Sequence, residues 1–143
     1  MKAENSIGGL LGKSSRLLSN RFNSELTSIG LTVQQWTLLA VLWEKSPQTQ
    51  KSLQEELLKD KASINSLVGY LVQNGFVLKE RNPKDKRSFL ISLTQKGEDI
   101  KNESIPMAMS SIALAIEGID KSDLEIFTKV TKEIIINLTK EKR

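Results

Sequence analysis

The sequence predicts a mainly α-helical fold with a small two-stranded β-hairpin, and three observations lead to that class. Residues 60–75, DKASINSLVGYLVQNG, carry apolar side chains at helical spacing and end at a glycine. After Gly75 the apolar period changes from about 3.6 to about 2, which is typical of a helix followed by half-buried strands. Amphipathic segments of helical period lie on both sides of this region. We therefore expect a helical protein with one hairpin.

Composition narrows the function classes. The 143 residues suit a single domain with a proper core, and the net charge is +4. With no cysteine and no histidine, the sequence cannot form disulfides, thiol nucleophiles, His-dependent triads or conventional zinc centres. A carboxylate-based enzyme or a Mg²⁺ site remains open on composition alone. Because no catalytic constellation is clustered in the sequence, and Glu98, Asp99 and Glu103 resemble a solvated helix face, no catalytic residues, metal or cofactor are expected, and the protein is not expected to be an enzyme. Because no leader pattern and no bilayer-length apolar run is present, we expect a cytoplasmic protein with no membrane partner.

The first two helices are expected at residues 5–29 and 33–46. Apolar residues at helical intervals mark the first, and Gly30 is a typical C-terminal glycine. Thr32, with Gln35 three residues later, predicts a capping box for the second helix, which is apolar almost all round and should be the core helix. Its two tryptophans are interpreted as core residues, with the lining of a ligand cavity as the alternative.

A helix-turn-helix is expected next. Ser46 and Pro47 break the pattern, and Thr49 or Ser52 can cap a short third helix. That helix is expected to face inward with three leucines, which are Leu53, Leu57 and Leu58. Only a few residues separate it from a helix capped by Asp60, so the two must pack at a steep angle.

The helix after Asp60 has one apolar and one polar face. Ile64, Leu67, Val68 and Leu71 share the apolar face, and Gly69 lies near the centre of the opposite arc. The polar arc is small and contains no acid, which suits close approach to another molecule. The strands that follow have a basic surplus at residues 79–87, so together they favour contact with DNA in the major groove and along the backbone.

Two long helices are expected at the C-terminal end. Thr94 is expected to cap the first, from about Gln95 to Glu117, with a bend at Pro106. Asp120 is expected to cap the last helix, residues 121–143, whose apolar stripe is wider than one small domain needs to cover. Residues 5–29 and 98–143 are thus expected to pack on a second copy of the chain. Intramolecular stacking of the termini is the alternative.

Residues 31–97 resemble the MarR family of winged helix-turn-helix transcription regulators. The most specific match is Asn82-Pro83, then Asp85-Lys86-Arg87-Ser88, then LTQKG at residues 93–97, at the family's distance from Asn74-Gly75. The resemblance implies a winged helix-turn-helix lobe at residues 31–97, with a two-stranded β-wing and with N- and C-terminal dimerisation helices. It also implies sequence-specific binding of double-stranded DNA by a homodimer on a pseudo-palindromic operator.

The resemblance places the DNA contacts on two elements. The helix at residues 60–74 matches the recognition helix, Arg87 matches the arginine that reaches the minor groove, and Asp85 matches the acid that orients it. The implied DNA-binding residues are Lys61, Ala62, Ser63, Asn65, Ser66, Tyr70, Lys84, Asp85, Lys86 and Arg87. The sequence departs from the family pattern at Gly69 and Tyr70, where an acid and an arginine are common.

The same resemblance implies a repressor that a small hydrophobic or aromatic effector releases. The effector region would be lined by Leu11, Ser15, Trp36 and Met107. The absent cysteine excludes the thiol peroxide-sensing branch of the family, and the absent histidine argues against its zinc-sensing branch. The alternative function is a winged-helix adaptor that binds protein and no DNA; the retained Asp85-Lys86-Arg87 segment argues against it.

Overall fold

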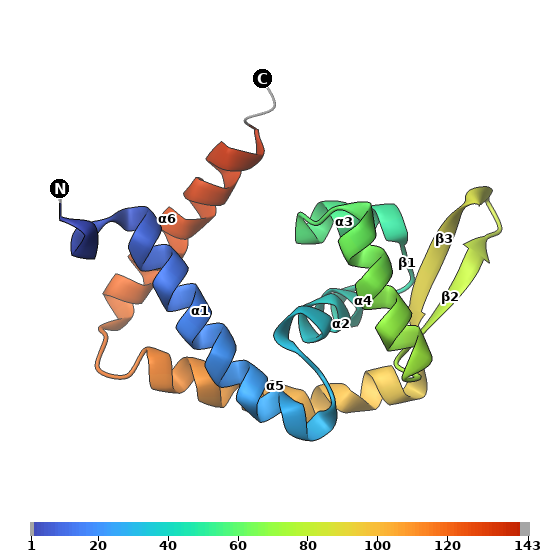
Figure 1. Ribbon diagram of the computed structural model, residues 1–143, viewed down its shortest axis with the longest axis horizontal. Helices are drawn as coiled ribbons and strands as arrows, with labels where there is room; N and C mark the ends of the chain where they lie inside the picture. Colours follow the sequence, from blue (N-terminus) through green and yellow to red (C-terminus); the bar gives the residue numbers. More distant parts are fainter. Residues whose placement is uncertain (1, 141–143) are drawn as a thin grey trace. The chain divides into compact units, whose positions relative to one another are not determined.

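The computed structural model describes residues 2–140, with two 3₁₀ turns, six α-helices and three strands in that part of the chain. The chain divides into two compact units, Met1–Ser111 and Ile112–Arg143, which are described separately. The elements are η1 (Ala3–Asn5), α1 (Ile7–Leu26), η2 (Thr27–Ile29), α2 (Val33–Glu44), β1 (Gln48–Thr49), α3 (Gln50–Leu57), α4 (Lys61–Gln73), β2 (Val77–Asn82), β3 (Asp85–Leu93), α5 (Gln95–Ala115) and α6 (Lys121–Thr139) (Figure 1).

The predicted signals between the first two helices are confirmed. The chain leaves η2 through Gly30, whose φ of 74° is left-handed and favours glycine. At the start of α2 the Gln35 amide donates to the Thr32 hydroxyl at 3.3 Å, and the Thr32 amide donates to the Gln35 side chain at 2.9 Å. This capping box satisfies two amides that the first turn of the helix would otherwise leave unpaired.

The core of the first unit forms around α2, as its apolar composition predicted. Leu38, Leu39 and Leu42 are buried together with side chains from α1, α3, α4 and the sheet. The two tryptophans pack against this core in an edge-to-face aromatic row. The ring centres of Phe22 and Trp36 are 5.0 Å apart, and those of Trp36 and Trp43 are 5.7 Å apart. Trp43 also donates its indole N–H to the carbonyl of Gly97 at 2.8 Å.

The helix-turn-helix consists of α3 and α4. Thr49 caps α3 by accepting a hydrogen bond from the Ser52 amide at 3.0 Å. Leu53 is fully buried and Leu57 packs against the core, but the expectation that Leu58 faces inward is wrong. Leu58 is the C-cap of α3, with a left-handed φ of 53°, and it is 66% exposed. The turn toward α4 requires that conformation, and it rotates the side chain away from the helix face.

The sheet has three strands, in the order β1-β3-β2, all antiparallel. The two-strand expectation is therefore incomplete, because Gln48 and Thr49 pair with Ile91 and Leu90 and add β1 at one edge. Two residues next to a proline carry no periodic signal, so this strand depends on its partner. Beyond β1, β2 and β3 continue as a hairpin away from the helices (Figure 1).

Glycine at position 97 allows the first turn of α5 to pack closely against the backbone of Phe76, which follows α4. Thr94 accepts a hydrogen bond from the Gly97 amide at 3.1 Å, which supports its predicted capping role. A Cβ atom at position 97 would lie 2.1 Å from the carbonyl oxygen of Phe76, so only glycine fits here without a backbone shift. The helix continues through Pro106 as far as Ala115.

The second unit holds α6. Gly118, with φ 78°, precedes it. Asp120 occupies the N-cap position, but its side chain makes no capping hydrogen bond, so the expected cap is formed by backbone position alone. No residue of α6 is buried, and Phe127, Ile136 and Leu138 are each more than half exposed. The helix was expected to reach residue 143; residues 141–143 lie outside the described part. Within residues 2–140 no single helix is long and apolar enough to cross a membrane, although residues 7–29 and 33–44 pass that test jointly across a 79° bend.

Candidate nucleic-acid interface

Helix α4 presents a small polar surface, as its sequence predicted. Ile64, Val68 and Leu71 are buried, while the expected DNA-facing residues Lys61, Ala62, Ser63, Asn65 and Ser66 are all exposed. No acidic residue lies between Lys61 and Gln73, and a Cβ atom at Gly69 would meet nothing within 4 Å. The surface is therefore free of negative charge and of bulk near its centre.

The N-terminus of α4 is capped by Asp60. The Asp60 carboxylate accepts a hydrogen bond from the Ser63 amide at 2.7 Å, and this bond holds the pKa of Asp60 below its ordinary value of 3.8. The negative charge also complements the positive end of the helix dipole. The cap therefore stabilises the first turn, in which Lys61, Ala62 and Ser63 are exposed.

Two of the expected base-contacting residues make contacts inside the protein. The Tyr70 hydroxyl donates a hydrogen bond to the carbonyl of Gly30, and its ring packs against the core. Tyr70 thus ties α4 to the segment before α2, which sequence reasoning missed because the partner is distant in the chain. Asn65 accepts a hydrogen bond on Oδ1 from the side-chain amide of Gln50, the first residue of α3.

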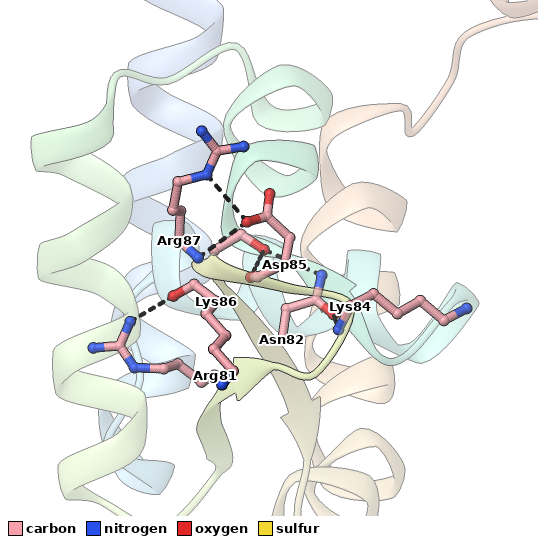
Figure 2. Close-up of polar contacts among 7 residues, drawn as sticks. Arg81, Asn82, Lys84, Asp85, Lys86 and Arg87 are labelled. Atoms are coloured by element: carbon pink, nitrogen blue, oxygen red, sulfur yellow. Dashed lines mark hydrogen bonds and ion pairs between the residues drawn. The ribbon is translucent and has the colours of Figure 1, made fainter.

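The β2–β3 turn is built by its own polar side chains (Figure 2). Asn82 and Asp85 pair across the turn, and the Asn82 side chain accepts a hydrogen bond from the Lys84 amide at 3.0 Å. Its amide nitrogen donates to the Ser88 hydroxyl at 3.1 Å, and that hydroxyl donates to the Asp85 carbonyl at 3.2 Å. These bonds fix a tight turn with both lysines, Lys84 and Lys86, exposed beside it.

Asp85 contacts Arg87 as the family pattern implies (Figure 2). One oxygen of the Asp85 carboxylate accepts hydrogen bonds from the backbone amide of Arg87 at 3.0 Å and from its Nε at 3.3 Å. The rest of the arginine extends outward, since its side chain is 92% exposed. An exposed ion pair of this kind adds little stability, so its evident effect is to direct the guanidinium.

Two further cations belong to the hairpin and were not among the predicted site residues. Lys79 Nζ lies 4.5 Å and Arg81 Cζ 5.1 Å from the centre of the Phe89 ring, and Arg81 donates to the Lys86 carbonyl at 2.6 Å (Figure 2). Strand pairing of Arg81 with Phe89 gives the aromatic–cation contact. The sequence did offer a signal for these two cations, because residues 79–87 contain five basic residues and only two acidic ones.

The two candidate surfaces belong to the same unit, and α4 packs against β2. A close-fitting polar helix beside a basic hairpin can place side chains against base edges and cations against phosphates. Within residues 2–140 no cluster of acidic residues could hold a metal ion.

An open depression of about 580 Å³ lies on the first unit. It is lined by Ser24, Glu25, Ser28, Glu103, Pro106, Met107 and Ser110. Of the four residues expected near an effector, only Met107 lines it. Trp36 lies in the aromatic row, with its indole nitrogen buried and unpaired in the described part of the chain. Leu11 and Ser15 lie on α1 and are not among the lining residues.

Comparison with known proteins gives consistent matches. Residues 31–89 match the family model described as MarR family. The organic hydroperoxide resistance transcriptional regulator of Bacillus subtilis is 30% identical over 115 residues, covering 80% of this chain and 78% of that protein.

Solved structures agree in fold. A MarR-family transcriptional regulator from Rhodococcus sp. RHA1 superposes with a TM-score of 0.87 at 21% identity, covering 94% of this chain and 95% of that one. CouR from Rhodococcus jostii RHA1, solved with bound p-coumaroyl-CoA, gives 0.85 at 21% identity, with 94% of each chain covered.

Proposed function

Because the chain belongs to the MarR family, and is thus a DNA-binding transcription regulator, we propose that it works as a homodimeric repressor on a pseudo-palindromic operator. The observation that carries the proposal is that two suitable surfaces lie in the same unit. One is the exposed arc of α4, which contains no acid; the other is the β2–β3 hairpin, where Asp85 holds Nε of Arg87 and the rest of the guanidinium is exposed. Each half-site would receive one α4 in the major groove and one hairpin along the adjacent minor groove. Such a regulator works where the DNA lies, so the cytoplasm is the proposed location.

The proposed DNA contacts are supported by the exposure of the side chains that would make them. Lys61, Ala62, Ser63, Asn65 and Ser66 form the α4 contribution, and Ser66 and Asn65 are the candidates for base edges. Lys84, Lys86 and Arg87 supply cations, and a cation in a narrow minor groove meets enhanced negative potential. Tyr70 is left out of the contact set, because its hydroxyl is already bound to Gly30.

The dimer would form through apolar surface that one chain leaves exposed. On α1, Ile7 and Leu17 are 70% and 63% exposed, and in the second unit Phe127 and Leu138 are 57% and 69% exposed. Burial of such surface gains about 25 cal/mol per Å². A second copy, bringing the same surfaces, is the simplest partner.

An effector is proposed because a related regulator, CouR, was solved with p-coumaroyl-CoA bound. The depression beside Met107 is the candidate position in this chain. A thiol-based response is excluded for these 143 residues, which contain no cysteine.

The test starts with selection of bound sequences from random DNA, followed by affinity at several salt concentrations. We expect an inverted repeat and a steep salt dependence. Arg87→Ala should weaken binding across sequences and lower the salt slope by about one unit.

Arg16→Ala is the matched control, because it removes the same side chain from α1, outside the helix-turn-helix and hairpin. Equal losses in the two variants would show that net charge alone matters. Absence of any DNA binding by the parent would instead favour the protein-binding adaptor.

A further inference from the structure

A buried glutamine links the two helices of the helix-turn-helix. Gln50 begins α3 and is only 8% exposed. Its Nε2 donates a hydrogen bond to Oδ1 of Asn65, which lies on the exposed face of α4. The contact thus connects the core side of α3 to a residue of the candidate DNA surface.

The bond determines which end of the Asn65 amide points outward. An asparagine amide has one oxygen that accepts and one nitrogen that donates twice, and rotation by about 180° exchanges them. With Oδ1 bound to Gln50, Nδ2 is the end left free for another molecule. A free asparagine would present either end.

The surroundings of Gln50 argue against a purely local packing role. Its Oε1 is buried without a hydrogen-bond partner in the described part of the chain, so the bond to Asn65 is the one hydrogen bond that this side chain makes there. The neighbouring buried glutamine differs. Gln48 donates to the carbonyls of Val41 and Lys45 and accepts from Ser52, so both ends of its amide are used near its own turn. Of these two glutamines, Gln50 is the one whose side-chain amide forms a hydrogen bond with α4.

We propose that Gln50 is a positioning residue for DNA recognition: it holds the Asn65 amide with its N–H donors toward the major groove, where they meet a base acceptor, which is N7 of a purine, O6 of guanine or O4 of thymine. Adenine, guanine and thymine each present an acceptor in that groove, whereas cytosine presents the N4 donor. The base that Asn65 reads should therefore not be cytosine. This inference rests on the proposed function, since it requires α4 to enter the groove.

Gln50→Met tests the inference, because methionine has similar length and packs well in an apolar site but cannot donate the bond. Gln54→Met is the matched control, since Gln54 lies on the same helix and its side chain makes no hydrogen bond there in the described part of the chain. Asn65→Ala and the double variant with Gln50→Met complete a cycle. Each protein is assayed by selection from random DNA, by affinity for the selected site and its four single-base versions, and by melting temperature.

We expect the parent and Gln54→Met to prefer adenine, guanine or thymine over cytosine at one position of each half-site by about five- to tenfold, the range for one good base contact. Gln50→Met and Asn65→Ala should each reduce that preference to about twofold or less, with an unchanged salt slope, and the double variant should lose nothing further. If Gln50→Met lowers the melting temperature, Gln50→Leu repeats the test with a branched apolar side chain.

A preference against cytosine that survives in Gln50→Met, or in Asn65→Ala, would overturn the inference. Binding of the parent to a selected operator would still stand in either case, so the proposed function would be unaffected. A parent that selects no sequence would overturn both.

Discussion

Replacing Gly69 and Gly97 by alanine, one at a time, should change the stability of this protein in opposite directions. Both glycines lie within α-helices and neither has a positive φ. A helix-propensity argument alone would predict that both substitutions stabilise. The space around the two glycines differs, so the two substitutions should have opposite effects on stability.

At position 69 the added methyl enters open space, since nothing lies within 4 Å of the Cβ position. The gain should therefore be the intrinsic one, about 1 kcal/mol for glycine to alanine in a helix interior, part of it from reduced entropy of the unfolded chain. For a chain of this length that corresponds to a rise of about 3 °C in Tm.

At position 97 the methyl would lie 2.1 Å from the carbonyl oxygen of Phe76 and 3.1 Å from Leu93 Cδ2. That carbonyl cannot move freely: it accepts from the Thr94 amide at 3.1 Å, and the Phe76 amide donates to Leu71 at 2.8 Å. Overpacking costs about 1–3 kcal/mol, and a methyl group this close to a held backbone oxygen belongs at the upper end, about 3 kcal/mol. The expected fall in Tm is about 10 °C.

Thermal and denaturant unfolding of the parent and both variants, at one protein concentration because of the expected dimer, measures the difference. Gly69→Ala doubles as the control for the chemistry of the substitution. A Gly97→Ala protein as stable as the parent would refute the close approach of α5 to Phe76. A destabilised Gly69→Ala protein would show that this arc of α4 is packed against something.

Three further predictions concern the other surfaces. Gly69→Glu should abolish operator binding and leave the fold intact, because it adds bulk and negative charge close to the phosphates. Its DNA affinity is measured beside that of Gly69→Ala. If Gly69→Glu keeps its affinity, this arc of α4 does not face the groove. Ile134→Glu should dissociate the dimer, because an unpaired carboxylate in an apolar interface costs several kcal/mol. The control Lys129→Glu, on the exposed surface of α6, should leave the dimer intact. If Ile134→Glu sediments as an unaltered dimer, this placement of the interface is refuted. Asp60 has a pKa lowered below 3.8 in the folded state, so its cap is fully stabilising above that pH and is lost as the pH falls through the lowered value. Asp60→Asn, which keeps a capping side chain, should therefore show a flatter dependence of unfolding free energy on pH in acid; parallel curves would contradict the cap.

The sequence alone determined those features that depend on neighbouring residues. The capping box of Thr32 and Gln35, the Asp60 cap, the left-handed Gly30 and the apolar face of α4 are all confirmed. Each arises from atoms a few residues apart, so periodicity and capping chemistry suffice to predict it. The Asp85–Arg87 contact, which the family resemblance implied, is also local, because the partners are two positions apart.

Tertiary structure decided the features whose partners are distant in the chain. Strand β1 exists because β3 offers it an edge, Gly97 is required because Phe76 lies against it, and Tyr70 is held by Gly30. The link between Gln50 and Asn65 spans fifteen positions and two helices. Local propensity carries no information about such pairs, since their geometry is set only when the helices pack. That packing also assigns Tyr70 to the fold and leaves Asn65 at the candidate DNA surface.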